Sequence, residues 1–429
     1  MFGFANFLLL ALFAAAVFDL IFALARGGGL RGALHGLWNT PHLLFGQQLA
    51  EWRLQLGRIL FAAGLAAYEI SVVFCNSMAR QNWAWVQGVM SPVLEWLAFL
   101  CFGAKILFGT RYTWRELLAG GALYFIARWV YFNSQNIWWI GIVVAVLAAK
   151  DVSLRRPLQV YFASGCAAMA AVLALHFAGI VAPDLTSERM GALRGTYGYG
   201  HPNTFGGLVF GLVLAYALLR AQKVRWVDCL LVFAVGVFLL VGPASRSAAL
   251  CTLALAVGLV FCRLRAGHSV PRWWPGTCAG MVGLTAAVSY LLPLLVIKVG
   301  PWNNDIGPAW LAKLDSLLTC RISLTWMAYR LLDVKIAGQV FNWPTVDNSF
   351  AFALFQFGPV VAALLGILFA AALWGHAKQG RRVEVCCLFA MLAYAYMEVQ
   401  PFHLTTNPTA LLLCGAVFAQ TSARWQKIE

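Results

Sequence analysis

The chain has 429 residues, of which 62% are apolar and only 11% are charged, and its mean hydropathy is +0.76. Soluble domains carry roughly a quarter charged residues, so this composition excludes a soluble enzyme, a disordered chain and a small disulfide-stapled secreted protein. The net charge of +15 does not indicate nucleic-acid binding, because no basic run is interleaved with aromatic residues. Lys and Arg collect instead in the cytoplasmic loops of membrane proteins.

Apolar stretches of about 20 residues, the length that crosses a bilayer, recur along the whole chain. The expected spans are Ala5–Ala25, Arg58–Met78, Pro92–Thr110, Trp114–Tyr131, Ile137–Ala149, Pro157–Val181, Asn203–Arg220, Trp226–Val241, Ser247–Arg263, Thr277–Lys298, Ser349–Trp374, Glu384–Glu398 and Asn407–Ser422. We therefore expect an all-α polytopic membrane protein with about 12–13 transmembrane helices. Residues 1–429 are expected to form a single integral membrane domain.

The cysteines predict neither a metal site nor a disulfide framework. The 11 Cys lie mostly in apolar stretches, form no CxxC pair, and have no His at zinc-ligand spacing. Buried Cys packs as a small hydrophobic side chain. We expect no metal and no cofactor.

Basic residues alternate between connections, which predicts the topology. The basic connections carry Lys150, Arg155, Arg156, Arg220, Lys223, Arg225, Arg263, Arg265, Arg272, Lys378, Arg381, Arg382, Arg424 and Lys427. This bias places these connections and the C-terminus in the cytoplasm. The connections expected to face outward in the second half are Ala182–Pro202, Gly242–Arg246, Gly300–Asn348 and Gln400–Thr406. Most of the unusual polar residues lie in or beside these four segments.

The first outward segment ends in Arg194-Gly-Thr-Tyr197-Gly-Tyr199-Gly-His201-Pro-Asn203. A structural role explains part of this motif, since Pro202 suits a first helical turn and Asn203 a helix cap. Arg194 is a candidate phosphate ligand, because guanidinium groups bind phosphate oxygens bidentately. His201 is a candidate acid or base, although a lone His is often only hydrogen-bonded in place.

Two further arginines lie in outward segments. Arg246 stands in a tight Ser-Arg-Ser turn, where the alternative is a side chain that snorkels to the interface. Arg321 lies in the long segment 300–348, which precedes the third-last expected span and is expected to be partly helical. Connections of that length are usually functional.

The last two candidates are acidic or polar motifs next to a span. Val346-Asp347-Asn348-Ser349 leads into the apolar run from Phe350, and an N-cap alone would explain Asp347 and Asn348. His403 stands in the last outward segment, where a polar turn is the simpler interpretation. Spans that begin near these outward motifs point their N-termini, each worth roughly half a positive charge, at the same surface.

We therefore expect Arg194, Arg246 and Arg321 to bind one diphosphate at the outer boundary of the membrane. An anion held there can carry a lipid tail that runs between helices into the bilayer. Transporters usually place charges or broken helices at the bilayer midplane, often in repeated halves. Here the polar groups cluster outside and no halves repeat, so a transferase is favoured over a flippase or permease.

In this order, the motifs Arg-Gly-x-x-Gly-x-x-His-Pro-Asn, Ser-Arg-Ser, Arg-x-x-x-x-Trp and Val-Asp-Asn-Ser-Phe resemble those of the oligosaccharide repeat-unit polymerases (Wzy-like) in the O-antigen ligase and polymerase superfamily. The resemblance covers roughly Leu185 to Asn407. It implies a metal-independent glycosyltransferase of the bacterial cytoplasmic (inner) membrane that polymerises undecaprenyl-diphosphate-linked oligosaccharides into capsule, exopolysaccharide or O-antigen. A chain-length regulator and a flippase are the implied partners, and the active site would face the extracytoplasmic side.

Carried over to this chain, the resemblance makes Arg194, Arg246 and Arg321 the diphosphate ligands. The position after the long segment, often His in the ligases, is Asp347 here, which favours a polymerase over an O-antigen-type ligase. Asp347 is the first candidate for the base that accepts the proton of the attacking sugar hydroxyl, and His201 is the second. Supporting roles would fall to Asn203, Asn348, His403, Tyr197 and Tyr199, the tyrosines packing either on sugar faces or in the core.

Overall fold

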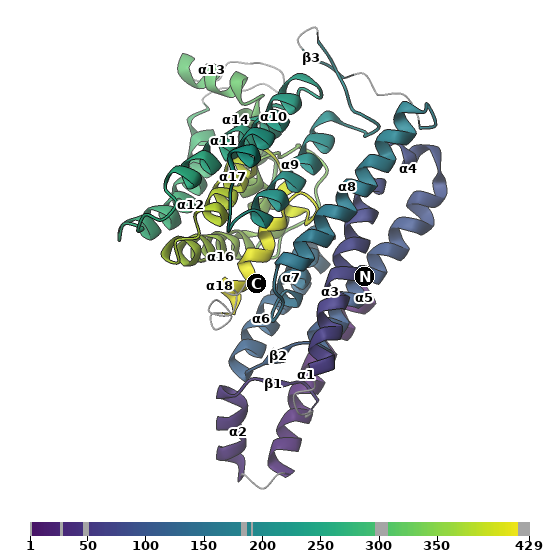
Figure 1. Ribbon diagram of the computed structural model, residues 1–429, viewed down its shortest axis with the longest axis vertical. Helices are drawn as coiled ribbons and strands as arrows, with labels where there is room; N and C mark the ends of the chain where they lie inside the picture. Colours follow the sequence, from purple (N-terminus) through teal and green to yellow (C-terminus); the bar gives the residue numbers. More distant parts are fainter. Residues whose placement is uncertain are drawn as a thin grey trace. The chain divides into compact units, whose positions relative to one another are not determined.

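The computed structural model describes residues 2–25, 29–45, 51–181, 187–189, 192–296 and 308–418, and nearly all of the regular structure is helical (Figure 1). The first nine helices are α1 (Phe2–Ala25), α2 (Gly29–Asn39), α3 (Glu51–Cys75), α4 (Ala79–Asn82), α5 (Ser91–Phe108), α6 (Trp114–Ser134), α7 (Ile137–Ala148), α8 (Arg155–Phe177) and α9 (Pro202–Leu219). The later ones are α10 (Trp226–Val241), α11 (Arg246–Leu264), α12 (Trp274–Leu291), α13 (Ala309–Leu317), α14 (Arg321–Leu331), α15 (Ser349–Phe352), α16 (Pro359–Lys378), α17 (Arg382–Met397) and α18 (Cys414–Val417).

Extended structure is limited to two short antiparallel pairs in the described residues. Strand β1 (His42–Leu43) pairs with β2 (Arg111–Tyr112), and β3 (Ser187–Arg189) pairs with β4 (Ala192–Arg194). The predicted all-α membrane fold is confirmed at this level, because a helix satisfies all of its backbone hydrogen bonds within one segment and can therefore cross lipid.

Eight helices of the described chain are long and apolar enough to cross a membrane. They are Gly3–Ala25, Glu51–Cys75, Val86–Phe108, Arg155–Phe177, Pro202–Leu219, Arg246–Leu264, Trp274–Leu295 and Pro359–Lys378. Three shorter apolar helices are Ile137–Ala148, Trp226–Val241 and Pro408–Val417. The expected number of 12–13 crossings therefore stays a prediction. The end of the last expected span, residues 419–422, lies outside the described residues.

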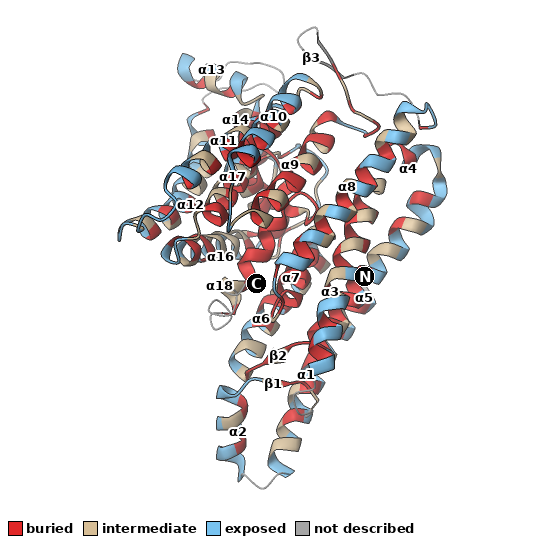
Figure 2. Cartoon of the chain, in the orientation of Figure 1, coloured by how far each residue is buried: buried red, intermediate tan, exposed pale blue. Residues whose placement is uncertain are grey.

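Several candidate spans carry exposed residues along their length (Figure 2), and many of these residues are large and apolar. On α1, for example, Phe7, Leu10 and Phe13 are each more than 60% exposed. A soluble protein rarely exposes a continuous apolar surface of this kind, whereas a membrane protein turns it toward lipid tails. The burial pattern therefore agrees with the composition.

The chain divides into two compact units. The first unit comprises Met1–Arg128, Ile140–Leu208 and Ala410–Glu429, and the second comprises Trp129–Trp139 and Val209–Thr409. In the first unit, α3 packs against α5 and α8. Helices α3 and α5 meet at two glycines, since a Cβ on Gly57 would lie 2.8 Å from the Gly109 carbonyl oxygen and 2.8 Å from Lys105 Cδ.

In the second unit, α11 packs against both α10 and α17, and α12 packs against α16. The span expected over Ser349–Trp374 is wrong as one continuous helix: α15 is followed by a π-helical turn, Ala353–Phe357, and α16 starts only at Pro359. The break lies at Gly358, which has a φ of 87°. A Cβ on Gly358 would lie 2.1 Å from the Ile336 carbonyl oxygen, so only glycine allows this close approach.

The described part of the long segment 300–348 contains α13 and α14 and is otherwise non-helical. Its first residues, 300–307, lie outside the described residues. The turn between α13 and α14 places Thr319 and Cys320 in the left-handed region, with φ values of 57° and 64°. This turn sets the position of Arg321, the first residue of α14.

Candidate active site

The predicted site residues fall in both units, and each group is described within its own unit. Arg194, Tyr197, Tyr199, His201 and Asn203 belong to the first unit. Arg246, Arg321, Asp347, Asn348 and His403 belong to the second.

The glycine-tyrosine motif of the first unit docks on the chain that follows α3. The backbone N–H of Met78 donates to the Gly198 carbonyl at 2.8 Å, and Ser77 forms an isolated β-bridge with Tyr199. Gly198 has a φ of 81°, which favours glycine at the turn. These bonds fix the backbone between Arg194 and the start of α9.

Arg194 is buried and donates from Nη2 to Asn203 Oδ1 at 2.9 Å. His201 is exposed, and its Nδ1 accepts the backbone N–H of Asn203 at 3.1 Å. Pro202 is the first residue of α9, as expected, but the expectation that Asn203 caps this helix is wrong. Asn203 is the second residue of the helix, and its side-chain oxygen accepts the hydrogen bond from Arg194.

The two tyrosines of the motif pack against one phenylalanine of α9. The ring centroids of Tyr197 and Tyr199 lie 5.0 and 5.6 Å from that of Phe205. Tyr199 is fully buried, and this burial, with the nearby charge of Glu69, raises the pKa of its hydroxyl. In this arrangement Tyr199 contributes to the interior of the unit, whereas Tyr197 is partly exposed.

In the second unit, Asp315 of α13 holds the start of α14. Its Oδ1 accepts the backbone N–H groups of Ile322 and Ser323 at 2.7 and 3.2 Å, and its Oδ2 accepts the Ser323 hydroxyl at 2.8 Å. A carboxylate at this position satisfies free N–H groups of the helix and interacts favourably with its dipole. Asp315 is fully buried and thereby fixes the helix that begins with Arg321.

The guanidinium of Arg321 is surrounded by acceptors. Its Nε donates to the carbonyl of Met397, and its Nη1 donates to the Leu318 carbonyl at 2.8 Å and to the Thr319 hydroxyl. Its Nη2 donates to Glu398 Oε1 at 2.6 Å. Arg321 and Glu398 therefore form a short ion pair between two buried side chains, with 8% and 6% of their side-chain surfaces exposed.

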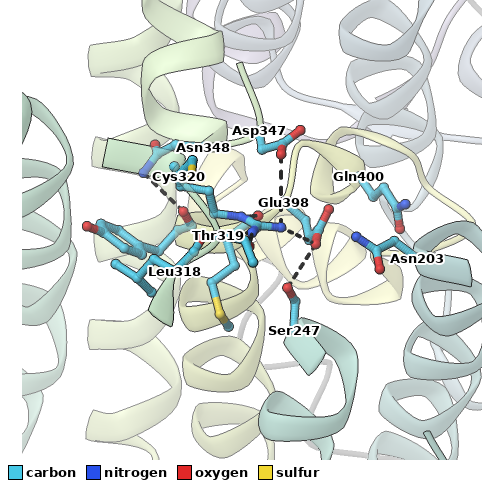
Figure 3. A network of polar contacts seen from close by, with 12 residues as sticks. Asn203, Ser247, Leu318, Thr319, Cys320, Asp347, Asn348, Glu398 and Gln400 are labelled. Atoms are coloured by element: carbon cyan, nitrogen blue, oxygen red, sulfur yellow. Dashed lines mark hydrogen bonds and ion pairs between the residues drawn. The ribbon is translucent and has the colours of Figure 1, made fainter. Parts of the chain in front are cut away.

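Glu398 joins the motifs of the second unit (Figure 3). Its Oε1 also accepts the hydroxyl of Ser247 at 2.8 Å, and its backbone carbonyl accepts the hydroxyl of Ser349 at 2.6 Å. Asp347 Oδ2 lies 4.0 Å from Arg321 Nη2, and Figure 3 shows Glu398 between Asp347 and Ser247. We refer to Arg321, Glu398, Asp347, Ser247 and Ser349 as the Glu398 cluster.

The electrostatics of the Glu398 cluster are unusual because two carboxylates share one guanidinium. Burial raises the pKa of Glu398, Arg321 opposes this shift, and the negative charge of Asp347 adds to it. The net pKa shift is upward. Asp347 differs from Glu398 in access, since 31% of its side-chain surface is exposed. It is therefore the carboxylate of the pair that an incoming hydroxyl group can reach.

Asn348 is a helix cap, the simpler of the roles considered for it. Its Oδ1 accepts the backbone N–H groups of Phe350 and Ala351 at 2.9 and 3.1 Å, which caps α15. Its Nδ2 donates to the Ser289 hydroxyl at 3.2 Å and to the Tyr396 carbonyl at 3.1 Å. Asn348 thus fixes the backbone on which Asp347 stands.

Arg246 and His403 complete the predicted residues of the second unit. Arg246 is the first residue of α11 and is exposed, next to Ser247 of the cluster. The His403 ring packs on Trp138, with centroids 4.0 Å apart. Burial lowers the pKa of His403 to about 4, so the ring is neutral at physiological pH and adds no positive charge for an anion.

The sequence-based list of candidate residues did not include Glu398. Its position at the end of an apolar run made it look like the boundary of the span expected over Glu384–Glu398. The sequence did contain an indication of its role, because a carboxylate at the outer end of an expected span needs a partner when it is buried. What the sequence does not give is that this partner is Arg321, 77 residues earlier in the chain.

Among the residues that the structure describes, no group of three or more His, Cys, Asp or Glu side chains is placed to hold a metal ion. Comparisons with protein-family models, with curated proteins and with solved structures find no match to this chain. The geometry of the Glu398 cluster is therefore the basis on which a function is proposed.

Proposed function

We propose that this protein is a membrane glycosyltransferase that polymerises undecaprenyl-diphosphate-linked oligosaccharide repeat units into a surface polysaccharide. The observation that supports this most is the Glu398 cluster. Three motifs in this chain resemble those of repeat-unit polymerases: Ser-Arg-Ser, Arg-x-x-x-x-Trp and Val-Asp-Asn-Ser-Phe. They are separate in the sequence, and their residues Ser247, Arg321, Asp347 and Ser349 meet around Glu398.

The charges of the cluster suit this reaction. A departing lipid diphosphate carries developing negative charge, which Arg321 and the neighbouring Arg246 stabilise electrostatically. The attacking sugar hydroxyl needs a proton acceptor within hydrogen-bond reach. Asp347 is assigned this role because its carboxylate is partly exposed and lies 4.0 Å from the same guanidinium.

In the proposed step, the hydroxyl oxygen of an acceptor sugar attacks the anomeric carbon of the lipid-linked donor. A new carbon–oxygen bond forms, and the bond from the anomeric carbon to the diphosphate oxygen breaks. The bonding electrons leave with undecaprenyl diphosphate, and the hydroxyl proton passes to Asp347. His201 remains the second candidate for this proton, and Arg194 a predicted diphosphate ligand, each to be tested by its own alanine variant.

The proposal includes a location and an orientation. The alternation of basic connections supports a protein of the bacterial cytoplasmic membrane with its C-terminus in the cytoplasm and about 12–13 crossings. In that topology, segment 300–348 and the Glu398 cluster face the extracytoplasmic side. A lipid-linked donor delivered by a flippase would meet the cluster there.

Reconstitution of the purified protein into proteoliposomes tests the function. With an undecaprenyl-diphosphate oligosaccharide as the only substrate, we expect lipid-linked products that are longer by whole repeat units, resolved by gel electrophoresis or mass spectrometry. Product that forms only after a different acceptor is added would identify a ligase instead. Movement of the lipid-linked unit across the bilayer without new glycosidic bonds would identify a flippase.

A further inference from the structure

The Glu398 cluster is built in a way that opposes anion binding in its ionised form. One guanidinium, that of Arg321, faces two carboxylates, Glu398 at 2.6 Å and Asp347 at 4.0 Å. With all three groups charged, these side chains carry a net charge of −1. A diphosphate that approaches Arg321 is then repelled by two carboxylates and has to compete with Glu398 for Nη2.

The remaining donors of Arg321 are also engaged within the protein. Nε is bound to the Met397 carbonyl, and Nη1 is bound to Leu318 and Thr319. These bonds hold the guanidinium plane in place, so that Nη2, the atom shared by Glu398 and Asp347, is the donor left for an incoming anion. Access is from the side of Asp347, the more exposed carboxylate.

We propose that Glu398 takes up a proton when a diphosphate binds to Arg321, so that a neutral carboxyl group stands beside the bound anion. This inference rests on the proposed function only in the identity of the anion. A neutral carboxyl accepts more weakly than a carboxylate and so competes less for Nη2, and its O–H becomes a hydrogen-bond donor to a phosphate oxygen. The Ser247 hydroxyl, which donates to Glu398 Oε1, keeps an acceptor in the neutral carboxyl group.

The electrostatic surroundings of Glu398 favour the uptake of a proton when an anion binds. Burial and Asp347 already raise its pKa in the free protein, against the opposing effect of Arg321. A bound anion adds a further negative charge and raises this pKa again, because like charges disfavour the ionised form. Among the described residues, those that interact electrostatically with Glu398 include Arg321 on α14, Asp347 before α15, Cys251 on α11 and Tyr394 on α17.

The sign of the pH dependence follows from linkage. The complex binds more protons than the free protein between the pKa of free Glu398, which is above 4.5, and its higher pKa in the complex. In that window the affinity for the anion falls as the pH rises. If one proton is taken up on binding, the affinity changes by at most about tenfold per pH unit.

The experiment measures the binding of inorganic pyrophosphate by calorimetry, in detergent, in buffers of different ionisation enthalpy. Glu398→Gln keeps the shape of the side chain and the acceptor for Ser247 and Arg321 but cannot titrate. Glu384→Gln, the same substitution near the other end of α17, is the matched control. Because pyrophosphate also titrates, each variant is compared with the wild type at the same pH.

We expect the wild type and Glu384→Gln to take up more protons on binding than Glu398→Gln does. We also expect Glu398→Gln to bind pyrophosphate about tenfold more tightly than the wild type at the upper end of the window, with the two converging at lower pH. Equal proton uptake in the wild type and Glu398→Gln would overturn the inference while leaving the diphosphate site intact. Absence of pyrophosphate binding by the wild type would instead remove the site itself, and with it the proposed function.

Discussion

At the scale of single residues, the ion pair between Arg321 and Glu398 takes two charges out of water. Such burial is costly unless the remaining donors and acceptors are bonded, and here Met397, Leu318 and Ser247 provide partners. Removing one member leaves the other buried without its counter-charge. This is why the pair is a sensitive point for stability as well as a candidate for function.

Arg321→Ala should lower the free energy of unfolding by about 3 kcal/mol or more, because it removes the guanidinium counter-charge of the buried Glu398 carboxylate. Arg321→Ala combined with Glu398→Gln should lose less than the sum of the two single changes, since a neutral side chain does not need the guanidinium. Chemical unfolding in mixed micelles measures both. Arg330→Ala, on the exposed last turn of the same helix, is the control and should stay within about 0.5 kcal/mol of the wild type.

Sequence analysis located Arg321, Asp347 and Asn348 because each belongs to a short motif beside an apolar run. It did not locate Glu398, whose role depends on a contact across 77 residues of chain. Local rules also misassigned the cap of α9, which begins at Pro202, so that the backbone N–H of Asn203 lies within the helix and is accepted by the His201 ring. Residue types and spacing predict which groups are unusual, whereas their partners are set by tertiary packing.

At the scale of elements, hydropathy predicted helices well where a span is uninterrupted. The bounds expected for Trp226–Val241 are those of α10. Hydropathy did not predict the break at Gly358, because the residues on both sides are equally apolar. The break arises from backbone conformation and from the approach of the Ile336 carbonyl, neither of which alters the hydropathy profile.

Gly57→Ala should destabilise the packing of α3 on α5, because the new Cβ would lie 2.8 Å from the Gly109 carbonyl oxygen. Gly121→Ala in α6 is the matched control, since a Cβ there meets nothing within 4 Å. The control should be neutral or gain up to about 1 kcal/mol from the higher helix propensity of Ala. Thermal unfolding of both variants in the same detergent tests this, and an equal effect of the two would contradict the described packing.

Mild oxidation should cross-link α11 to α17 through Cys262 and Cys386, whose sulfur atoms lie 3.5 Å apart. Only a small adjustment brings them to the bonding distance of about 2 Å. A protease site placed between the two helices would yield fragments that stay joined on a non-reducing gel. Cys386→Ser should abolish the link and Cys387→Ser should retain it; a link that survives Cys386→Ser would contradict the contact.

At the scale of the whole molecule, composition alone gave the membrane class and the helical fold, because a chain that is 62% apolar has few other stable solutions. The number of crossings does not follow from composition, since the apolar helices α10 and α7, with 16 and 12 residues, are shorter than the roughly 20 residues that cross a bilayer. The orientation rests on the distribution of Lys and Arg among the connections.

Cys320 offers a native probe of that orientation, since it is the one exposed residue among the 11 cysteines. A membrane-impermeant maleimide should label Cys320 when added outside intact cells or spheroplasts, and Cys320→Ser should remove the signal. Labelling that requires opening of the inner membrane would place segment 300–348 in the cytoplasm and refute the proposed topology.

The most direct test of the account compares polymer synthesis by Arg321→Ala, Arg321→Lys and Arg330→Ala in proteoliposomes, at equal amounts of folded protein. If Arg321 stabilises the departing diphosphate, Arg321→Ala should lose about 100-fold or more in rate. Arg321→Lys should retain part of the activity, because it keeps the charge without the planar fork, and Arg330→Ala should match the wild type. Wild-type rates in Arg321→Ala would contradict the claim that the Glu398 cluster is the active site.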